Sequence, residues 1–478
     1  MSTCVLVSLT GIASLVLTWI VRALCVRQAW LSTAVGSRLE HPPTPRFGGI
    51  AIGSAMALAC LFSNVWKEPR LLLLLGPAFG IFLLGLADDV WQLSPKTKLA
   101  FQLVLAVVPA AAGFVLPITH LKLVDQAITV FWFVSLTNAF NLLDNMNGLA
   151  AGTAIIVACF RGLIAYHQDD RIGLLLCLCL ASAVAGFLVF NFPKGLIFMG
   201  DSGALFLGFT LASFAFTGTH AYIKSYLDAL VFPVLMLLPI CDTTFVTIVR
   251  CLCGRPISQG GKDHLSHSLL GFGLSASMSV VLLWIITAVC GAVSLAAAIF
   301  GSARTLTLVI ILLATMITIV VNLARYQLAV SGMLSEMLAR KSPGGIALTL
   351  GFDLLLAVSA YYSACLLTFT KISEAQKFFW HSGFVVIATQ SVAMLLIGCY
   401  PRLPVMRAHR MLQIAAACAV GACVAFAAGL FLGPEIHPEV SLLYFVLAAV
   451  LIVIYRWFHQ IVESHCVLLE SYAQNGSD

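Results

Sequence analysis

From Ile197 to Phe209 the sequence reads Ile-Phe-Met-Gly-Asp-Ser-Gly-Ala-Leu-Phe-Leu-Gly-Phe, an apolar run interrupted by one carboxylate, Asp201. An ionised side chain among apolar residues is costly unless it has a partner or a function. The flanking Gly200 and Gly203 carry no side-chain bulk, which lets backbone amides or a metal-bound phosphate approach the carboxylate. Taken alone, the motif is also compatible with a simple helix cap.

Apolar runs like this one recur along the whole chain. Hydrophobic residues make up 61% of the 478 residues and charged residues only 10%, whereas soluble domains carry roughly 25% charged residues. A membrane-spanning helix needs about 20 mostly apolar residues, and we find about fifteen such runs. They lie near residues 4–24, 48–64, 70–87, 99–118, 126–143, 149–166, 171–190, 203–217, 227–249, 275–299, 304–323, 344–369, 379–399, 410–432 and 440–458. The sequence therefore predicts an all-α, polytopic integral membrane helical bundle, with a retained first helix rather than a cleaved signal peptide.

The distribution of basic residues predicts the orientation in the membrane. Placing residue 1 outside puts most of the 26 Lys and Arg residues on the cytoplasmic side, where such residues concentrate in short loops. We expect a multi-pass protein of the plasma (inner) membrane with its active site on the cytoplasmic face. The net charge of +6 is then a signal of topology and calls for no nucleic-acid partner.

Two polar clusters occupy the first hundred residues. Arg46 follows three prolines and precedes paired glycines, so the segment is either a stiff loop or a phosphate contact. Asp88 and Asp89 end an apolar run, and adjacent carboxylates at a membrane boundary normally need a cation or a substrate, although two solvated loop acids are the alternative. Lys98 is positioned either to anchor the inner leaflet or to hold an anionic substrate.

A third cluster ends the fifth predicted span. Asn138, Asn141 and Asp144 are spaced by three and share one helical face, and Asn147 and Gly148 follow in a predicted turn. Such a stripe either joins helices or contacts a ligand.

The longest predicted cytoplasmic loop contains Lys262, His264 and His267. No cysteine or further histidine completes a tetrahedral zinc set, which favours phosphate recognition, and an ordinary pair of loop histidines is the alternative. Because all the clusters lie on one side in the predicted topology, a single site at the cytoplasmic interface explains them together.

The ordered motifs resemble one known family. They are Pro-Thr-Pro-Arg-Phe-Gly-Gly (43–49), Gly-Leu-Ala-Asp-Asp (85–89), Asn-Ala-Phe-Asn-Leu-Leu-Asp (138–144), Asn-Phe-Pro (191–193), Phe-Met-Gly-Asp-Ser-Gly (198–203) and Asp-His-Leu-Ser-His (263–267). Together they look like the polyprenyl-phosphate N-acetylhexosamine-1-phosphate transferase superfamily (glycosyltransferase family 4). The resemblance covers roughly residues 1–330 and implies a core of ten or eleven helices. Residues 331–478 would then be about four appended transmembrane helices of unknown role.

The resemblance implies an activity and its partners. Members transfer a sugar 1-phosphate from a UDP-N-acetylhexosamine to a polyprenyl phosphate in the bilayer, release UMP, and use Mg²⁺, with Mn²⁺ as an alternative ion. Because the histidine loop lacks three contiguous histidines, the undecaprenyl-phosphate GlcNAc-1-phosphate branch fits better than phospho-N-acetylmuramoyl-pentapeptide transferase. The product would initiate a surface glycan such as lipopolysaccharide O-antigen or teichoic acid, and a homodimer is left open.

Site residues follow by matching position. The resemblance makes Asp201 the main magnesium ligand, with Asp88 and Asp89 beside the metal and the lipid phosphate. It assigns nucleotide, diphosphate or acceptor contacts to Lys98, Asn141, Asp144, His264 and His267. Arg46 and Lys262 are expected to bind phosphate because of their residue types and positions. Asn147 stands where the family often has a second Asp, so it is expected to contact the donor base or sugar through an amide.

The expected chemistry is a single displacement. A phosphate monoester has a second pKa of about 6, so the acceptor is mostly a dianion at neutral pH and attacks without a strong general base. A covalent aspartyl phosphate on Asp88 is the alternative mechanism. Alternative functions are muramyl-pentapeptide-phosphate transfer and, in a different class, transport or flipping of anionic lipids.

Overall fold

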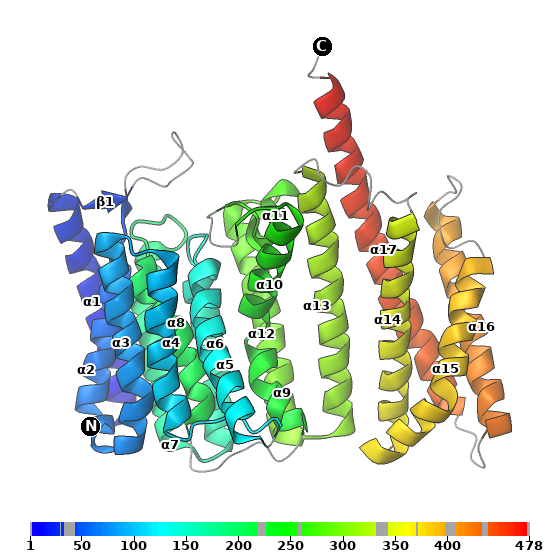
Figure 1. The fold of residues 1–478 in the computed structure, drawn as a ribbon, viewed down its shortest axis with the longest axis horizontal. Coiled ribbons are helices and arrows are strands. Elements are labelled where there is room, and N and C mark those ends of the chain that lie inside the picture. Colours follow the sequence, from blue (N-terminus) through cyan, green and yellow to red (C-terminus); the bar gives the residue numbers. More distant parts are fainter. Residues whose placement is uncertain are drawn as a thin grey trace. The chain divides into compact units, whose positions relative to one another are not determined.

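A computed structural model describes residues 2–28, 30–32, 44–119, 121–217, 226–256, 261–330, 343–369, 371–396, 407–432 and 438–475. Helices dominate these residues (Figure 1). They are α1 (Thr3–Arg27), α2 (Gly48–Phe62), α3 (Pro69–Trp91), α4 (Pro95–Ala111), α5 (Lys122–Leu143), α6 (Leu149–His167), α7 (Arg171–Asn191), α8 (Gly200–Ser213), α9 (Tyr226–Leu235), α10 (Leu237–Leu252), α11 (Leu265–Gly271), α12 (Ala276–Phe300), α13 (Ala303–Val330), α14 (Pro343–Thr368), α15 (Ile372–Leu396), α16 (Arg407–Leu432) and α17 (Pro438–Asn475). Two short 3-10 turns, η1 (Val65–Lys67) and η2 (Phe214–Phe216), and an antiparallel pair of two-residue strands, β1 (Leu31–Ser32) and β2 (Thr44–Pro45), complete the described elements.

The polytopic helical class is confirmed. Within the described ranges, ten helices are long and apolar enough to cross a membrane, and an eleventh span results if the bent pair α9 and α10 is counted as one. Each of the fifteen predicted runs overlaps a helix, but α2, α4 and α8 have only 15, 17 and 14 residues. A helix rises about 1.5 Å per residue, so these three are shorter than a full crossing of the hydrocarbon layer.

The span predicted over residues 227–249 is broken into two helices. Here α9 and α10 meet at an angle of 69°. Pro239 has no N–H to donate to the carbonyl of Leu235 and its ring clashes with that carbonyl, so a proline at this position breaks the helix.

Two compact units divide the chain. The first comprises Met1–Thr244 and Leu269–Ile299, and the second comprises Phe245–Ser268 and Phe300–Asp478. The assignment of the transferase core to residues 1–330 concerns activity and stays a prediction.

The first unit is built around α8. Every residue from Ser202 to Ser213 is buried, as expected for a helix surrounded by other helices. Its neighbours include α2, α3 and α5 (Figure 1). Glycines allow the closest approaches, because a Cβ on Gly85 would lie 2.5 Å from the carbonyl oxygen of Asp201, and one on Gly49 would lie 2.2 Å from the backbone nitrogen of Gly203.

The second unit contains buried charges that the sequence reasoning missed. Arg456 of α17 forms an ion pair with Asp353 of α14, and both side chains are buried. Two charges of the final helices therefore neutralise each other inside this unit. At the surface of this unit, Lys371 and Glu374 form an exposed pair at 3.3 Å.

Candidate active site

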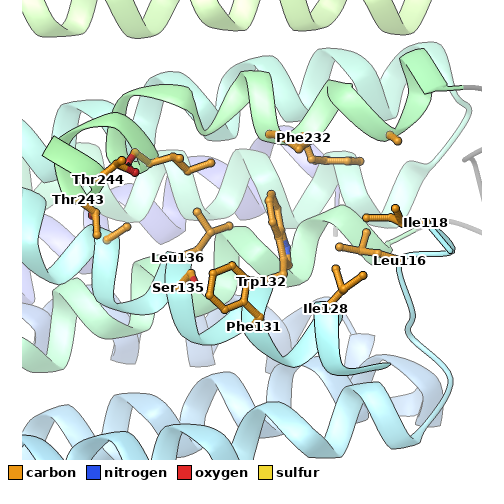
Figure 2. Close-up of a pocket in the computed structure, with 14 residues that line it drawn as sticks. Leu116, Ile118, Ile128, Phe131, Trp132, Ser135, Leu136, Phe232, Thr243 and Thr244 are labelled. Atoms are coloured by element: carbon orange, nitrogen blue, oxygen red, sulfur yellow. Dashed lines mark hydrogen bonds between the residues drawn. The ribbon is translucent and has the colours of Figure 1, made fainter. Parts of the chain in front are cut away.

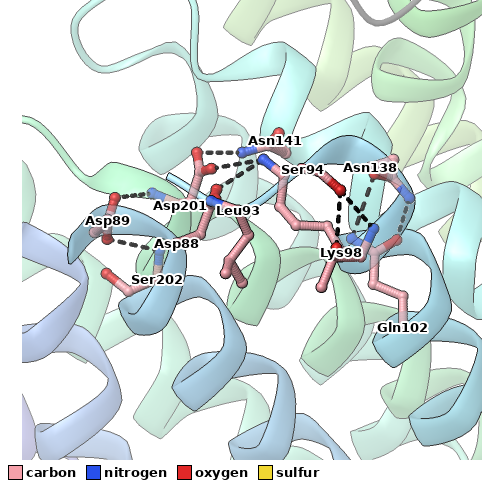
Figure 3. A network of polar contacts seen from close by, with 11 residues as sticks. Asp88, Asp89, Leu93, Ser94, Lys98, Gln102, Asn138, Asn141, Asp201 and Ser202 are labelled. Atoms are coloured by element: carbon pink, nitrogen blue, oxygen red, sulfur yellow. Dashed lines mark hydrogen bonds and ion pairs between the residues drawn. The ribbon is translucent and has the colours of Figure 1, made fainter. Parts of the chain in front are cut away.

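Asp89 joins the C-terminal end of α3 to the N-terminal end of α8. Its Oδ1 accepts the backbone N–H of Asp201 at 2.8 Å, and its Oδ2 accepts that of Ser202 at 3.0 Å (Figure 3). These N–H groups belong to the first turn of α8, where backbone N–H groups have no partner within the helix. The helix dipole also favours a negative charge at this end. Asp201 itself does not cap the helix, because the N-cap residue is Met199. The helix-cap interpretation of Asp201 is therefore wrong.

Helices α3, α4 and α5 contribute polar side chains to the surroundings of Asp201. Lys98 Nζ of α4 lies 2.7 Å from Asp88 Oδ2 and 3.1 Å from Asp201 Oδ2. Asn141 Nδ2 of α5 donates to Asp201 Oδ1 at 2.8 Å (Figure 3). Asp88 is also held by the backbone N–H of Leu93 at 2.7 Å. The tertiary structure thus brings together four predicted site residues, because Lys98 contacts Asp88 and Asp201 and Asn141 contacts Asp201.

Backbone hydrogen bonds attach the segment of Arg46 to the residues before α8. Phe198 N donates to Pro45 O at 2.7 Å, and Gly48 N donates to Phe198 O at 3.0 Å. Gly200 has φ +76°, and a Cβ there would lie 2.2 Å from the carbonyl oxygen of Arg46. Only glycine fits this conformation and this approach without strain.

A polar cavity of about 210 Å³ adjoins these residues. It is lined by Arg46, Asn141, Asp144, Asn145, Met146, Asn147, Asn191, Phe198, Gly200 and Asp201. Five of the predicted substrate or metal residues therefore share one cavity wall. Asn147 lies directly over Gly195, since a Cβ on that glycine would come within 2.4 Å of Asn147 Nδ2.

Asn191 supports this cavity, and the sequence reasoning did not place it in the site. Its Oδ1 accepts the N–H of Gly148 at 2.6 Å, and its Nδ2 donates to Ile197 O at 2.9 Å. Asn191 thereby connects the turn after α5 to the segment that precedes α8. The Asn-Phe-Pro motif was the available signal.

Asp144 follows the last residue of α5 and has an unusual proton affinity. Burial raises the pKa of its carboxyl to about 7, the negative charges of Asp201 and Asp89 add to the increase, and Arg46 opposes it. The carboxyl is therefore poised near neutral pH, and a cation in the cavity would favour its ionised form.

Lys262, His264 and His267 belong to the second unit. Lys262 is exposed, His264 is buried, and the two imidazole rings lie 5.9 Å apart. Arg250 holds this segment through Asp263, with Nε to Oδ2 at 2.7 Å and Nη2 to Oδ1 at 3.2 Å. Burial opposes the ionisation of Asp263, but the hydrogen bonds and charge of Arg250 outweigh it, so the pKa of the carboxyl lies below its ordinary value. Sequence reasoning missed this pair, because residues 13 apart are matched only by folding.

The donor set at α8 fits a magnesium ion that shares its coordination with a substrate. No group of three or more His, Cys, Asp or Glu side chains in the described part of the chain is arranged to hold a metal alone. Magnesium usually takes one or two carboxylates and completes its octahedron with water and phosphate oxygens. Asp201 and Asp144 line the same cavity and supply that number of carboxylates.

An apolar pocket of about 360 Å³ lies farther along α5 (Figure 2). It is lined by Leu116, Ile118, Ile128, Phe131, Trp132, Ser135, Leu136, Ala139, Ala229, Phe232, Pro233, Ile240, Thr243 and Thr244. The bend between α9 and α10 forms one wall. Ala139 precedes Asn141 by two residues, so the pocket begins about 3 Å along the helix axis from the polar site.

Comparison with known proteins places these residues in a shared region. A model of glycosyl transferase family 4 matches residues 71–219, which include Asp88, Lys98, Asn141, Asp144 and Asp201. The probable undecaprenyl-phosphate N-acetylglucosaminyl 1-phosphate transferase of Bacillus subtilis is 33% identical over 282 residues, covering 57% of this chain and 78% of that protein. Decaprenyl-phosphate N-acetylglucosaminephosphotransferase of Mycolicibacterium smegmatis is 30% identical over 320 residues, 58% of this chain and 79% of that protein. Phospho-N-acetylmuramoyl-pentapeptide-transferase of Bacillus cytotoxicus is 34% identical over 207 residues, 37% of this chain and 62% of that protein.

Proposed function

We propose, from the premise that this chain belongs to glycosyl transferase family 4, that it transfers N-acetylglucosamine 1-phosphate from UDP-GlcNAc to a polyprenyl phosphate and releases UMP. One observation carries the proposal. Lys98 and Asn141 converge on Asp201 within the matched region, at the edge of a polar cavity that also contains Arg46 and Asp144. Such a site suits a reaction in which two phosphate groups must meet.

The proposed reaction is an in-line displacement at phosphorus. An oxygen of the acceptor phosphate attacks the phosphorus that carries the sugar, the bond from that phosphorus to the bridging oxygen breaks, and UMP leaves with the bridging oxygen. Catalysis of this kind rests on positioning and charge neutralisation rather than on covalent chemistry by the protein. Lys98 and Arg46 supply positive charge beside the polar cavity. We assign contacts with the donor phosphates to Lys262, His264 and His267.

Magnesium would be held by Asp201, with Asp88 and Asp144 nearby. When bound, the ion neutralises phosphate charge and lowers the cost of bringing two anions together. Asp89 is placed differently, because both of its oxygens already accept backbone hydrogen bonds from α8. We therefore propose that Asp89 positions Asp201, and its direct ligation of the metal stays a prediction.

The apolar pocket beside α5 suits the isoprenoid chain of the acceptor. An acceptor of this class joins one phosphate to a long hydrocarbon, so its site needs polar and apolar parts in continuity. The pocket is lined by α5 residues from Ile128 to Ala139, and Ala139 lies within one turn of Asn141. The polar end of the chain would then lie towards Lys98.

The N-acetylglucosamine branch is favoured by the extent of the similarity. The two N-acetylglucosamine relatives share 282 and 320 aligned residues with this chain, whereas the muramoyl-pentapeptide relative shares 207. Initiation of a surface glycan such as O-antigen or teichoic acid is the corresponding cellular role. We place the reaction at the cytoplasmic face of the plasma membrane, on the strength of the Lys and Arg distribution.

A reconstituted assay tests the proposal. Purified protein in detergent with UDP-GlcNAc, undecaprenyl phosphate and Mg²⁺ is expected to release UMP, and omission of any one component is expected to abolish release. Asp201→Asn is expected to lose turnover. Turnover confined to UDP-N-acetylmuramoyl-pentapeptide would reassign the branch. Movement of a labelled lipid across vesicles without UMP release would favour the transporter alternative.

A further inference from the structure

The histidine segment, residues 263–268, is anchored at both ends. At its start, Asp263 is paired with Arg250 at the end of α10. At its end, Ser268 Oγ accepts a hydrogen bond from Gln327 Nε2 of α13 at 2.9 Å. Ser268 is fully buried, so this bond is shielded from competition with water.

The second anchor reaches His264 through one hydroxyl group. Ser268 Oγ donates to the carbonyl oxygen of His264 at 3.0 Å, and the backbone N–H of Ser268 donates to the same oxygen at 3.0 Å. Gln327 therefore orients the hydroxyl that holds the first turn of α11. Gln327 and His264 are thus linked through Ser268.

The helix that carries Gln327 is itself held by the appended helices. On α13, Asn322 Oδ1 lies 3.0 Å from His459 Nδ1 of α17, and Arg325 Nη1 lies 3.1 Å from the same nitrogen. Residues three apart share a helical face, whereas Gln327 follows Arg325 by two positions and points to another side. Helix α13 thus contacts α17 with one face and the histidine segment with the other.

We propose that Gln327 is a positioning residue that sets His264 and His267 for the donor phosphates, and that α17 stabilises Gln327 in this position through α13. The inference rests on the proposed function, and it gives residues 331–478 a role in the transferase reaction. A neutral hydrogen bond contributes modestly, so its loss is expected to raise the KM for UDP-GlcNAc by about 2- to 10-fold. The kcat is expected to change less than twofold, since Gln327 touches no reacting group.

The test compares variants that remove the same bond from either side. Gln327→Met keeps the size of the side chain and removes the donor, and Ser268→Ala removes the acceptor. Both are expected to raise the donor KM, and Ser268→Ala more so, because it also removes the bond to His264 O. The double variant is expected to be no worse than Ser268→Ala, which already removes the bond to Gln327. Thr315→Val is the matched control on α13, since its hydroxyl bonds only within the helix, to Ile311 O at 2.8 Å.

Amide hydrogen exchange over Leu265–Gly271 provides a readout that does not depend on turnover. Faster exchange in Gln327→Met and, to a smaller extent, in His459→Leu is expected, with no change in Thr315→Val. Unchanged exchange, or faster exchange with an unchanged donor KM in an active enzyme, would overturn the inference. A wild-type protein that does not use UDP-GlcNAc would instead overturn the proposed function, while the exchange result would still test the anchoring.

Discussion

The carboxylate of Asp89 accepts the backbone N–H of Asp201 at 2.8 Å, so one acid of the adjacent pair holds the helix that presents the acid of the Gly-Asp-Ser-Gly motif. Replacing Asp89 with Ala is expected to cost about 1 kcal/mol of stability, the usual value of a lost helix cap. It should also lower kcat, because Asp201 loses its placement. Asp89→Asn, whose amide oxygen still accepts one bond, is expected to be intermediate in both.

Thermal unfolding and UMP release measure the two effects of Asp89 separately. Asp170→Asn is a stability control outside the candidate site, since Asp170 caps α7 by accepting the N–H of Gly173 at 2.8 Å and also pairs with buried Arg161 at 3.3 Å. The control is expected to lose stability and keep its kcat. An Asp89→Ala protein with normal kcat would argue against the positioning role.

Lys98 is the one cation that contacts both Asp88 and Asp201 in the described part of the chain. Lys98→Gln is expected to lower kcat by about 10²- to 10³-fold, the range seen when a group that stabilises developing charge is removed. Lys96→Gln is the control, because Lys96 is exposed two residues away, and it should stay within about twofold of wild type. Equal effects of the two changes on initial rates would show that only general surface charge matters.

The pKa of Asp144 predicts a pH dependence. Its pKa is raised from 3.8 to about 7, so the folded metal-free protein binds a proton that the unfolded chain releases. Stability without Mg²⁺ should therefore fall as pH rises from about 4 to 7, because ionisation of the buried acid is unfavourable. Added Mg²⁺ should offset that loss above pH 7, where the carboxylate is charged.

Melting curves from pH 5.5 to 8.5 in EDTA or Mg²⁺ check this dependence. Asp144→Asn should flatten the metal-free profile. In rate measurements, the same variant distinguishes titration of Asp144 from titration of the acceptor. The acceptor phosphate titrates near pH 6 and would still do so in the variant. A profile identical in both proteins would mean that Asp144 does not titrate in this range.

Arg250 and Asp263 form a buried ion pair, and breaking it from one side leaves an uncompensated charge. Arg250→Gln or Asp263→Asn alone is expected to destabilise the protein by about 3–5 kcal/mol, and the double variant by less. Because the pKa of Asp263 is lowered, the contribution of the pair is present above the ordinary Asp pKa and is lost as pH falls through the lowered value. Unfolding monitored in detergent, with donor KM alongside, measures both effects.

The apolar pocket predicts a dependence on acceptor length. Ser135→Phe should fill part of the roughly 360 Å³ space and raise the KM for undecaprenyl phosphate more than that for a short prenyl phosphate. Val104→Phe is the control, because Val104 is 65% exposed on the outer face of α4. Equal KM changes for long and short acceptors would place the hydrocarbon chain elsewhere.

The membrane class and the main polar residues could be predicted from local sequence. The bend within a predicted span and the pairing of distant charges could not. Residues 227–249 are mostly apolar, so periodicity gave no sign of the 69° bend between α9 and α10. Proline was the only local signal, and many membrane helices tolerate proline. Likewise, Asp353 and Arg456 lie 103 residues apart, and only folding shows that they neutralise each other.

By itself, the sequence determined that the chain is a bundle of apolar helices and that Asp88, Asp89, Asn141, Asp144 and Asp201 are its unusual polar residues. These conclusions follow from composition and spacing, which are local properties. Tertiary structure alone decided which acid does what: Asp89 holds α8, Lys98 joins Asp88 to Asp201, and Asp144 shares a cavity with Arg46. The physical reason is that hydrogen bonds and ion pairs act over about 3 Å, a distance that sequence separation does not encode.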